Sequence, residues 1–214
     1  MKYDPIITVG RQYGSGGRYV AKLLAEKLNI PYYDKELLAE AAKDSGICRD
    51  VLEEYDEKNS RSLLFSLLSG SQPHAESGIM YMDMPLNHRI FLAQFDTIRR
   101  IADEGPCVIV GRCADYILRD RDDLLSVFIH APLEFRVERA RTAYQIDTDN
   151  IEAHVKKQDK TRANFYNRIS DRKWGDANSF HFAMSSVYGI DFSAEVLKHA
   201  AMHFLAHKDE NPEK

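Results

Sequence analysis

A glycine-rich turn follows an apolar run near the start of the chain. Gly14, Ser15, Gly16 and Gly17 come after residues 6–10 and immediately before a helical pattern. A turn between a strand and a helix presents unpaired backbone N–H groups, and the helix dipole adds partial positive charge there. Glycines let the backbone approach an anion without Cβ clashes. The turn therefore predicts phosphate binding, although a plain structural turn has the same composition.

The turn departs from the phosphate-loop pattern G-x-x-x-x-G-K-[ST]. Arg11 stands at its first glycine, Gly17 at its lysine and Arg18 at its hydroxyl residue. Arg11 and Arg18 are the local cations able to replace the lysine, because a guanidinium grips phosphate bidentately; a merely solvated Arg18 is the alternative. Tyr13 completes the expected nucleotide-binding residues. If the lysine and the hydroxyl were the only defects, Gly17→Lys with Arg18→Ser would rebuild an ordinary loop.

Short apolar runs alternate with helical patterns, which predicts an α/β fold with a parallel sheet and helices on both faces. The expected strands are residues 6–10, 31–34, 108–110, 125–129 and 180–184. The helix after the glycine turn is expected to end at Asn29, and a last helix to run from Ser193, as its N-cap, to about His207.

Residues 46–85 interrupt this alternation, with a helical pattern over 50–68 followed by loop-like sequence. An insertion at this point of an open α/β sheet would lie over the carboxyl ends of the strands, where ligands bind. An inert surface excursion is the alternative interpretation.

Composition predicts one enzyme-sized domain over residues 1–214. The net charge of −4 argues against a nucleic-acid polymer as partner, yet residues 136–173 hold ten Lys and Arg against six Asp and Glu. This basic segment suits a phosphate-bearing ligand. The 3 cysteines lack metal-ligand spacing and indicate reduced thiols. Neither a signal peptide nor a membrane span is expected, so the chain is predicted to be cytoplasmic.

Three segments resemble the cytidylate kinase-like family of P-loop proteins: residues 7–18, residues 30–38 and residues 107–118. They read ITVGRQYGSGGR, IPYYDKELL and CVIVGRCADYIL and occur in family order. The resemblance implies a nucleoside-monophosphate-kinase fold with a five-stranded parallel sheet, an acceptor-binding insert (about residues 46–85) and a mobile lid (about residues 136–173).

The resemblance also implies roles for residues outside the turn. Asp34 stands where related kinases carry an acid, which orients the acceptor oxygen or holds a metal-bound water; capping the following helix is the compatible alternative. Arg112 matches the arginine of the family's Asp-Gly-Arg-Asp motif, which binds the acceptor phosphate, although the flanking acids are replaced. In the lid, Asp159 and Arg162 resemble an Asp-x-x-Arg pair at i,i+3 spacing, with Asp159 holding Arg162 against the transferring phosphoryl group. Arg139 is the preferred further lid cation.

Arg89 and Gln94 fall in the region that meets the acceptor base in such kinases. The predicted function is transfer of the ATP γ-phosphoryl group to a nucleoside monophosphate or related small acceptor, with Mg²⁺ bridging the donor phosphates. Two alternatives stay open: a different small-metabolite kinase, and a nucleotide-binding regulatory module without catalysis. The protein ligands of the metal and the oligomeric state are left open.

Overall fold

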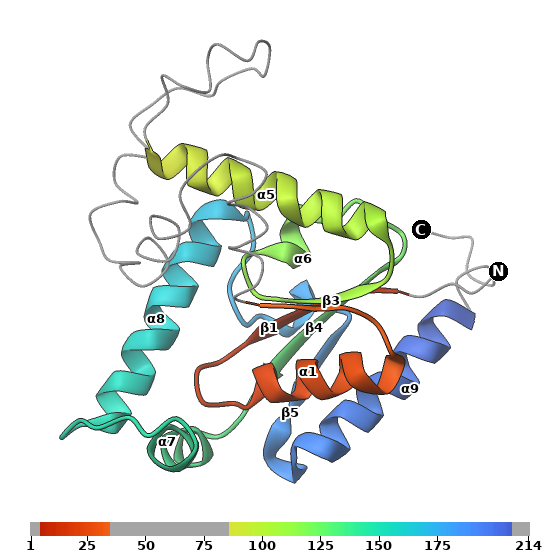
Figure 1. Cartoon of the computed structure of the whole chain (residues 1–214). Coiled ribbons are helices and arrows are strands. Elements are labelled where there is room, and N and C mark those ends of the chain that lie inside the picture. Colours follow the sequence, from red (N-terminus) through yellow and green to blue (C-terminus); the bar gives the residue numbers. More distant parts are fainter. Residues whose placement is uncertain (1–4, 35–85, 207–214) are drawn as a thin grey trace. The chain divides into compact units, whose positions relative to one another are not determined.

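The computed structural model of the chain describes residues 5–34 and 86–206 (Figure 1). The chain divides into two compact units, residues 1–34 with 101–214 and residues 35–100. Of the second unit, the structure describes residues 86–100, which form most of helix α5 (Leu86–Glu104). In this helix the guanidinium carbon of Arg99 lies 4.5 Å from the centroid of the Phe95 ring. The predicted insert at 46–85, with its helix at 50–68, lies outside the described residues.

The first unit is built on a five-stranded sheet in the order β2-β3-β1-β4-β5, and every pairing is parallel. Its strands are β1 (Ile6–Arg11), β2 (Tyr32–Tyr33), β3 (Cys107–Val110), β4 (Leu124–His130) and β5 (Phe182–Ser185). The glycine turn leaves the carboxyl end of the central strand, β1. In open α/β sheets the crevice at that edge is where ligands bind.

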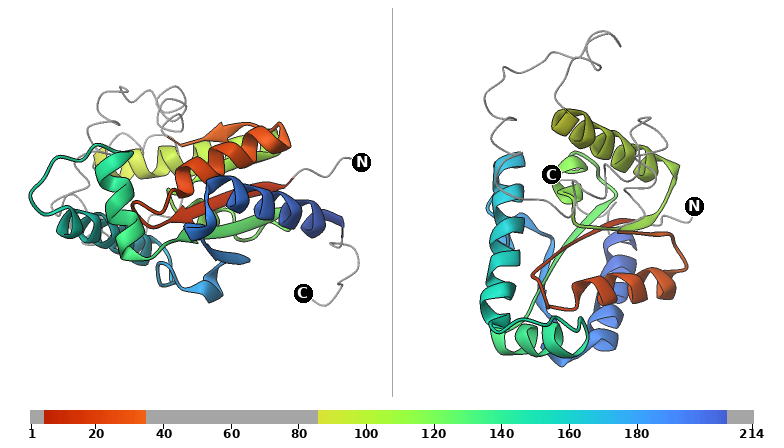
Figure 2. Two further views of the ribbon diagram at one scale, coloured as in Figure 1. Left: turned by 90° about the horizontal axis from the view of Figure 1, so that it is seen from below. Right: turned by 60° about the vertical axis from the view of Figure 1, so that its left-hand side comes forward.

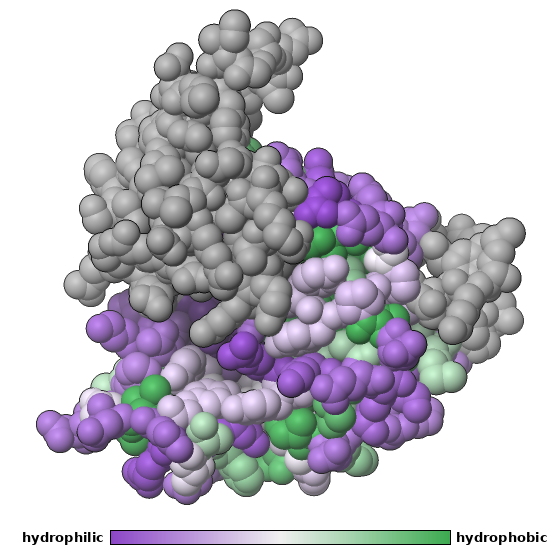
Figure 3. Space-filling view, viewed as in Figure 1, coloured by the Kyte–Doolittle hydropathy of each residue, from purple (hydrophilic) through white to green (hydrophobic). Residues whose placement is uncertain are grey.

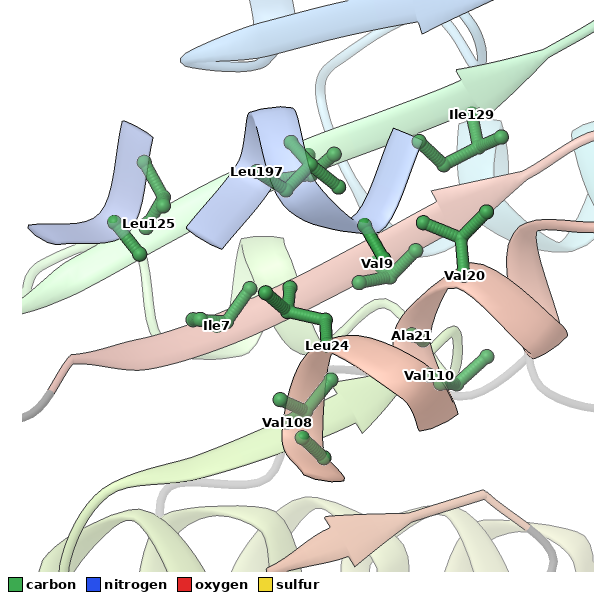
Figure 4. Close-up of a cluster of buried hydrophobic side chains, with 14 residues drawn as sticks. Ile7, Val9, Val20, Ala21, Leu24, Val108, Val110, Leu125, Ile129 and Leu197 are labelled. Atoms are coloured by element: carbon green, nitrogen blue, oxygen red, sulfur yellow. The ribbon is translucent and has the colours of Figure 1, made fainter. Parts of the chain in front are cut away.

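Two helices cover one face of this sheet, α1 (Gly17–Leu28) and α9 (Ile190–Ala206) (Figures 1 and 2). Val20 and Leu24, one turn apart on α1, are fully buried among side chains of the central strands and of α9 (Figure 4). Truncating a side chain such as Leu24 to alanine would cost about 2–5 kcal/mol, because its space would stay partly empty. This packing fixes the start of α1, and with it the glycine turn.

The opposite face carries α6 (Ala114–Ile117) and the C-terminal part of α8 (Ile151–Ile169). Side chains alternate along β4, so Val127 packs toward α1 and α9 while Phe128 packs with Tyr166 and Phe180 on the other side. Trp174 meets Phe128 edge-on at 5.3 Å between ring centroids. The prediction of a parallel five-stranded sheet with helices on both faces is confirmed.

Several predicted boundaries shift. β1 runs one residue further than expected, to Arg11, and β5 begins at Phe182 rather than at residue 180. The expected N-cap at Ser193 is wrong, because α9 begins at Ile190 and Ser193 lies one turn inside it. There its hydroxyl donates to the carbonyl of Gly189 at 2.7 Å. Asn29 does end α1, with a left-handed φ of 54°.

Three further elements complete the described fold: α7 (Leu133–Thr142) and the 3₁₀ turns η1 (Ala177–Ser179) and η2 (Ser186–Tyr188). On the face seen in Figure 3, hydrophilic residues predominate among those described, with hydrophobic ones scattered between them. None of the described helices is both long and apolar enough to cross a bilayer.

Candidate functional site

The glycine turn, residues 12–16 between β1 and α1, is a compact loop that tolerates no side chain at two positions. Gly14 and Gly16 have φ of 78° and 77°, in the left-handed region that favours glycine. A Cβ on Gly14 would lie 2.5 Å from the carbonyl oxygen of Arg136, and one on Gly16 would lie 2.5 Å from Ile190 Cδ1. Both predicted loop glycines are therefore required by conformation and by space.

Polar contacts fix the loop to the end of the sheet. The backbone N–H of Gln12 donates to Ile129 O at 3.0 Å, and its side-chain oxygen accepts from Ala131 N at 3.1 Å. The Ser15 hydroxyl donates to Gln12 O at 2.9 Å and accepts from the Gly17 N–H at 3.3 Å. Gln12 was not among the predicted site residues, since nothing in its sequence context distinguishes a loop-fixing glutamine from a solvated one.

A further hydroxyl reaches the loop from η2. Ser186 is 1% exposed, and its side chain donates to the carbonyl of Ser15. Its place in the sequence, directly after β5, gives no signal of this contact, because the chain must fold before the two serines meet.

Helices α7 and α8 lie beside the same loop (Figure 2), and three of their arginines donate to backbone carbonyls there. Arg136 donates to Tyr13 O at 3.3 Å, Arg139 to Gly14 O at 2.9 Å and Arg162 to Arg11 O at 3.1 Å. The carbonyl oxygens of residues 11, 13 and 14, at the end of β1 and in the loop, thus each accept from a guanidinium group. The basic segment predicted as a lid supplies all three cations.

Asp159 pairs differently from the prediction. One carboxylate oxygen accepts from the Tyr13 N–H at 2.7 Å, and the other forms an ion pair with Arg136. The expected partner Arg162 instead reaches the backbone of Arg11 and lies 5.4 Å from the centroid of the Tyr13 ring. The i,i+3 spacing put both residues on one helix face, but Arg136 of α7 competes for the same carboxylate.

Arg136 and Asp159 together hold residue 13 of the loop by both backbone groups. Arg136 is 8% exposed, and its Nε also donates to Ala131 O at 3.0 Å. The Tyr13 carbonyl accepts from Arg136 while the Tyr13 N–H donates to Asp159. We call this arrangement the Arg136–Asp159 strut. The sequence analysis preferred Arg139 as the lid cation among the three arginines of α7. In the structure Arg136 is the arginine of this helix whose residue is buried.

Asp34 is buried, 4% exposed, at the end of β2, and two predicted arginines converge on it. Arg18 Nε lies 2.6 Å from one carboxylate oxygen, and Arg11 Nη2 lies 3.7 Å from the other. The structure thus brings together residues from two of the three sequence segments, 7–18 and 30–38. Whether Asp34 also caps a following helix concerns residues outside those described.

The Arg11 side chain runs from the end of β1 toward Gly111 at the end of β3. A Cβ on Gly111 would overlap the Arg11 guanidinium. Burial, and next the charge of Arg162, lower the pKa of Arg11 to about 9, against the opposing influence of Asp34. Arg11 therefore stays a cation at neutral pH. Its Nε is buried and has no hydrogen-bond partner among the described residues.

Arg112 stands on an unusual turn after β3. Gly111, Arg112 and Cys113 have consecutive positive φ values of 75°, 60° and 56°. The Ala114 N–H closes the turn onto Gly111 O at 3.1 Å. A left-handed conformation costs a non-glycine residue roughly 1–2 kcal/mol, so the surrounding packing must hold Arg112 and Cys113 in place. The strained turn sets the Arg112 side chain at the carboxyl edge of the sheet.

The space around Gly17 overturns one expectation. A Cβ on this residue would lie 2.7 Å from Arg11 Cβ and 3.0 Å from Ile129 Cβ. Real Cβ atoms do not approach to 2.7 Å, so Gly17→Lys with Arg18→Ser does not rebuild an ordinary loop while Arg11 is present. The sequence could not show this, because the contact between positions 11 and 17 depends on the path of the loop.

Magnesium has no evident set of protein ligands among the residues described. They contain no group of three His, Cys, Asp or Glu side chains able to hold a metal ion. Position 18 offers a guanidinium rather than a hydroxyl, the Ser15 hydroxyl is engaged within the loop, and Asp34 is paired with arginines. The chemistry of these donors suits anions rather than a resident cation.

Two predicted acceptor residues, Arg89 and Gln94, lie on α5 in the second compact unit. The Arg89 side chain lies outside the described part of the chain. Their predicted contact with an acceptor base stays a prediction.

Comparison with known proteins gives a family match over residues 6–188, to the cytidylate kinase-like family. A cytidylate kinase of Methanopyrus kandleri is 24% identical over 95% of this chain and 96% of its own length. A solved structure of an uncharacterized protein from Eubacterium ventriosum is 29% identical, with a TM-score of 0.68 over 93% of this chain and 99% of that one.

Kinases of small metabolites share the fold at lower identity. A gluconokinase from Sinorhizobium meliloti superposes with a TM-score of 0.58 at 15% identity over the full length of both chains. A shikimate kinase from Bacteroides thetaiotaomicron gives 0.54 at 14% identity, covering 92% of this chain and 98% of that one. The resemblance predicted from the three sequence segments is confirmed by the family match.

Proposed function

The chain belongs to the cytidylate kinase-like family, and on that premise we propose that it transfers the γ-phosphoryl group of ATP to a small phosphorylated acceptor. A nucleoside monophosphate is the first choice of acceptor, with cytidylate as the choice that the family suggests. The proposal treats residues 1–214 as one kinase-like domain, residues 46–85 as its acceptor-binding insert and residues 136–173 as its lid.

One observation carries the proposal: guanidinium groups from α7 and α8 meet the backbone of a glycine loop at the end of the central strand. The loop lies before the N-terminus of a long helix, where N–H groups and the helix dipole favour a phosphate. Phosphoryl transfer needs positioning and neutralisation of charge more than covalent help from the protein. A glycine loop flanked by arginines supplies both.

Each residue then has a defined task. Backbone N–H groups of residues 14–17 hold the donor phosphates, those of Ser15 and Gly17 turning from Gln12 O and the Ser15 hydroxyl. Arg139 and Arg162 turn from loop carbonyls to the transferring group. Arg112 holds the phosphate of the acceptor, and Asp34, kept in place by Arg18, orients the attacking oxygen. Closure of the lid excludes water, which would otherwise compete as acceptor. Mg²⁺ enters with the substrate as MgATP, since it is commonly held largely by nucleotide phosphates and water.

Two alternative functions predict different results in activity and binding measurements. A kinase of another small metabolite would use the same donor loop with a different acceptor. A regulatory module would bind ATP without transferring its phosphoryl group, because the lysine of the ordinary loop is absent.

The test is a screen for ADP release from MgATP with each nucleoside monophosphate and with a panel of small hydroxy acids and sugars. We expect release that depends on a monophosphate, and a phosphorylated product by mass spectrometry. ADP release with a sugar or hydroxy acid alone would identify the protein as a kinase of another small metabolite. Tight ATP binding by calorimetry without transfer to any acceptor would contradict the kinase and leave the regulatory module.

A further inference from the structure

Positions 11 and 17 of this chain carry the reverse of the ordinary phosphate-loop residues. The pattern G-x-x-x-x-G-K places glycine at the first position and lysine at the last. Here the first position is Arg11 and the last is Gly17. These two positions therefore still carry one cationic side chain in total, but it stands at position 11 instead of position 17.

The structure explains why the exchange is coupled. A Cβ on Gly17 would lie 2.7 Å from Arg11 Cβ and 3.3 Å from Arg11 Cγ. Removing the 2.7 Å contact therefore requires glycine at one of the two positions, whereas the 3.0 Å contact with Ile129 Cβ remains in either case and needs a small shift of that side chain. An arginine at 11 requires glycine at 17, and a lysine at 17 requires glycine at 11.

The guanidinium of Arg11 is placed where a shared cation is useful. It lies against Gly111, with Asp34 3.7 Å from its Nη2, and so stands between the glycine loop and the turn that carries Arg112. Its Nε keeps an unused donor among the described residues. Arg18, by contrast, is 49% exposed at its side chain and commits its Nε to Asp34 at 2.6 Å. Of the two arginines that flank the glycine turn in the sequence, Arg11 is the one whose Nε is buried without a hydrogen-bond partner among the described residues.

We propose that Arg11 is the catalytic cation that replaces the phosphate-loop lysine, through a sterically reciprocal exchange with Gly17. This assignment rests on the proposed function. During transfer an acceptor oxygen forms its bond to the γ-phosphorus while the bond from phosphorus to the bridging oxygen breaks and its electron pair leaves with ADP. Arg11 approaches the equatorial oxygens from the strand side rather than from the helix, and neutralises their charge.

The test is a set of four variants. Arg11→Gly removes the cation, Gly17→Lys adds a lysine that clashes, and Arg11→Gly/Gly17→Lys restores glycine at the first position of the pattern and lysine at position 17. Arg11→Ala/Gly17→Lys is the matched control, because it keeps the Cβ at position 11 that causes the clash. Each variant is measured for thermal unfolding, for phosphoryl transfer, and for the ratio of ADP to ATP dissociation constants, which reports the grip on the γ-phosphate.

We expect Arg11→Gly to fold and to lose at least ~10²-fold in kcat, the usual loss when one transition-state donor is removed. Gly17→Lys and the alanine control should unfold at lower temperature than the wild type. The Arg11→Gly/Gly17→Lys protein should recover its unfolding temperature and at least ~10-fold of the lost kcat. A double variant no better than the alanine control would overturn the proposal, as would a Gly17→Lys protein as stable and active as the wild type.

Failure of the proposed function would be recognisable separately. If the wild type transfers no phosphoryl group to any acceptor, the kinase proposal fails, while the binding ratios and unfolding temperatures still decide the role of Arg11. A preference for ATP over ADP that is lost in Arg11→Gly and regained in the Arg11→Gly/Gly17→Lys protein supports the γ-phosphate contact. A ratio that stays constant across the set contradicts it.

Discussion

Arg112 occupies a backbone conformation that an L-residue adopts only at a cost. Its φ of 60° follows that of Gly111 and precedes that of Cys113, all positive. Strain of this kind persists where the surroundings over-determine it, and it often accompanies function. Three consecutive positive φ values give this turn a path that an ordinary turn does not have, and this path sets the Arg112 guanidinium at the carboxyl edge of the sheet.

We expect Arg112→Ala to raise the KM of the acceptor by about 10- to 100-fold while leaving ATP affinity nearly unchanged, because a charged hydrogen bond to the acceptor phosphate is lost. Steady-state kinetics with each substrate varied in turn measure both effects. Arg119→Ala, which removes an arginine bonded to Tyr116 O nearby, is the control. Equal loss of ATP affinity in Arg112→Ala would reassign this residue to the donor.

Gly14 offers a second test at the level of one atom. We expect Gly14→Ala to weaken ATP binding by at least about 10-fold and to lower the unfolding temperature, because the added Cβ meets the Arg136 carbonyl. Gly105→Ala is a matched control, since Gly105 also has a positive φ but has nothing within 4 Å of the added Cβ. Calorimetry and thermal unfolding separate the two. Equal effects at both positions would show that backbone strain alone matters.

Between elements, the Arg136–Asp159 strut joins α7 and α8 and holds residue 13 of the loop between them. A buried ion pair contributes little net stability, but removing one partner leaves an uncompensated charge. The strut fixes the backbone of residue 13, and in the proposed function this holds the loop in the conformation that binds phosphate.

We expect Arg136→Gln and Asp159→Asn each to weaken ATP binding by about 10-fold or more, and the double variant to lose less than the product of the two, because each change already breaks the same pair. ATP dissociation constants measured over this cycle test the coupling. Arg141→Gln breaks an exposed pair with Glu138 on the same helix and should change little. Strictly multiplicative losses would show that the two residues act independently.

Elements whose signals are local were predictable from the sequence. The glycines of the loop, the buried strands and the end of α1 at Asn29 all follow from spacing and residue type. Ser193 misled because a serine hydroxyl serves equally well as an N-cap and as a donor to a carbonyl one turn back. The partner of Asp159 and the contact between Arg11 and Gly17 depend on segments that meet only in the folded chain, so no local pattern could reveal them.

At the scale of the whole molecule, one buried carboxyl group connects α6 with α8 on the sheet face opposite α1 and α9. Asp115 of α6 is 4% exposed and accepts from the Tyr166 hydroxyl of α8 at 2.6 Å. Burial raises the pKa of Asp115 above its ordinary value, against the opposing hydrogen bond from Tyr166. The folded state therefore binds a proton more tightly than the unfolded chain does at this residue.

The direction in which stability changes with pH follows from this difference in proton affinity between the folded and unfolded states. Between the unfolded pKa of about 4 and the higher folded value, stability falls as pH rises, because the folded state must release its proton. Asp115→Asn keeps an acceptor for Tyr166 and removes the charge. We expect the unfolding temperature of this variant, relative to wild type, to rise between about pH 4 and pH 7. Exposed Asp122→Asn is the control, and a difference that is constant with pH would contradict the prediction.

The close approach of positions 11 and 17 also constrains how such a loop can evolve. Starting from glycine at the first position and lysine at the last, a first substitution to arginine at 11 meets the existing side chain, and a first substitution to glycine at 17 discards the cation. If Arg11 has the role proposed above, either single step lowers activity and only the two changes together restore it, which is the pattern called sign epistasis. On the same premise, loops with arginine at position 11 and loops with lysine at position 17 carry the same charge, although only the second kind matches the lysine pattern.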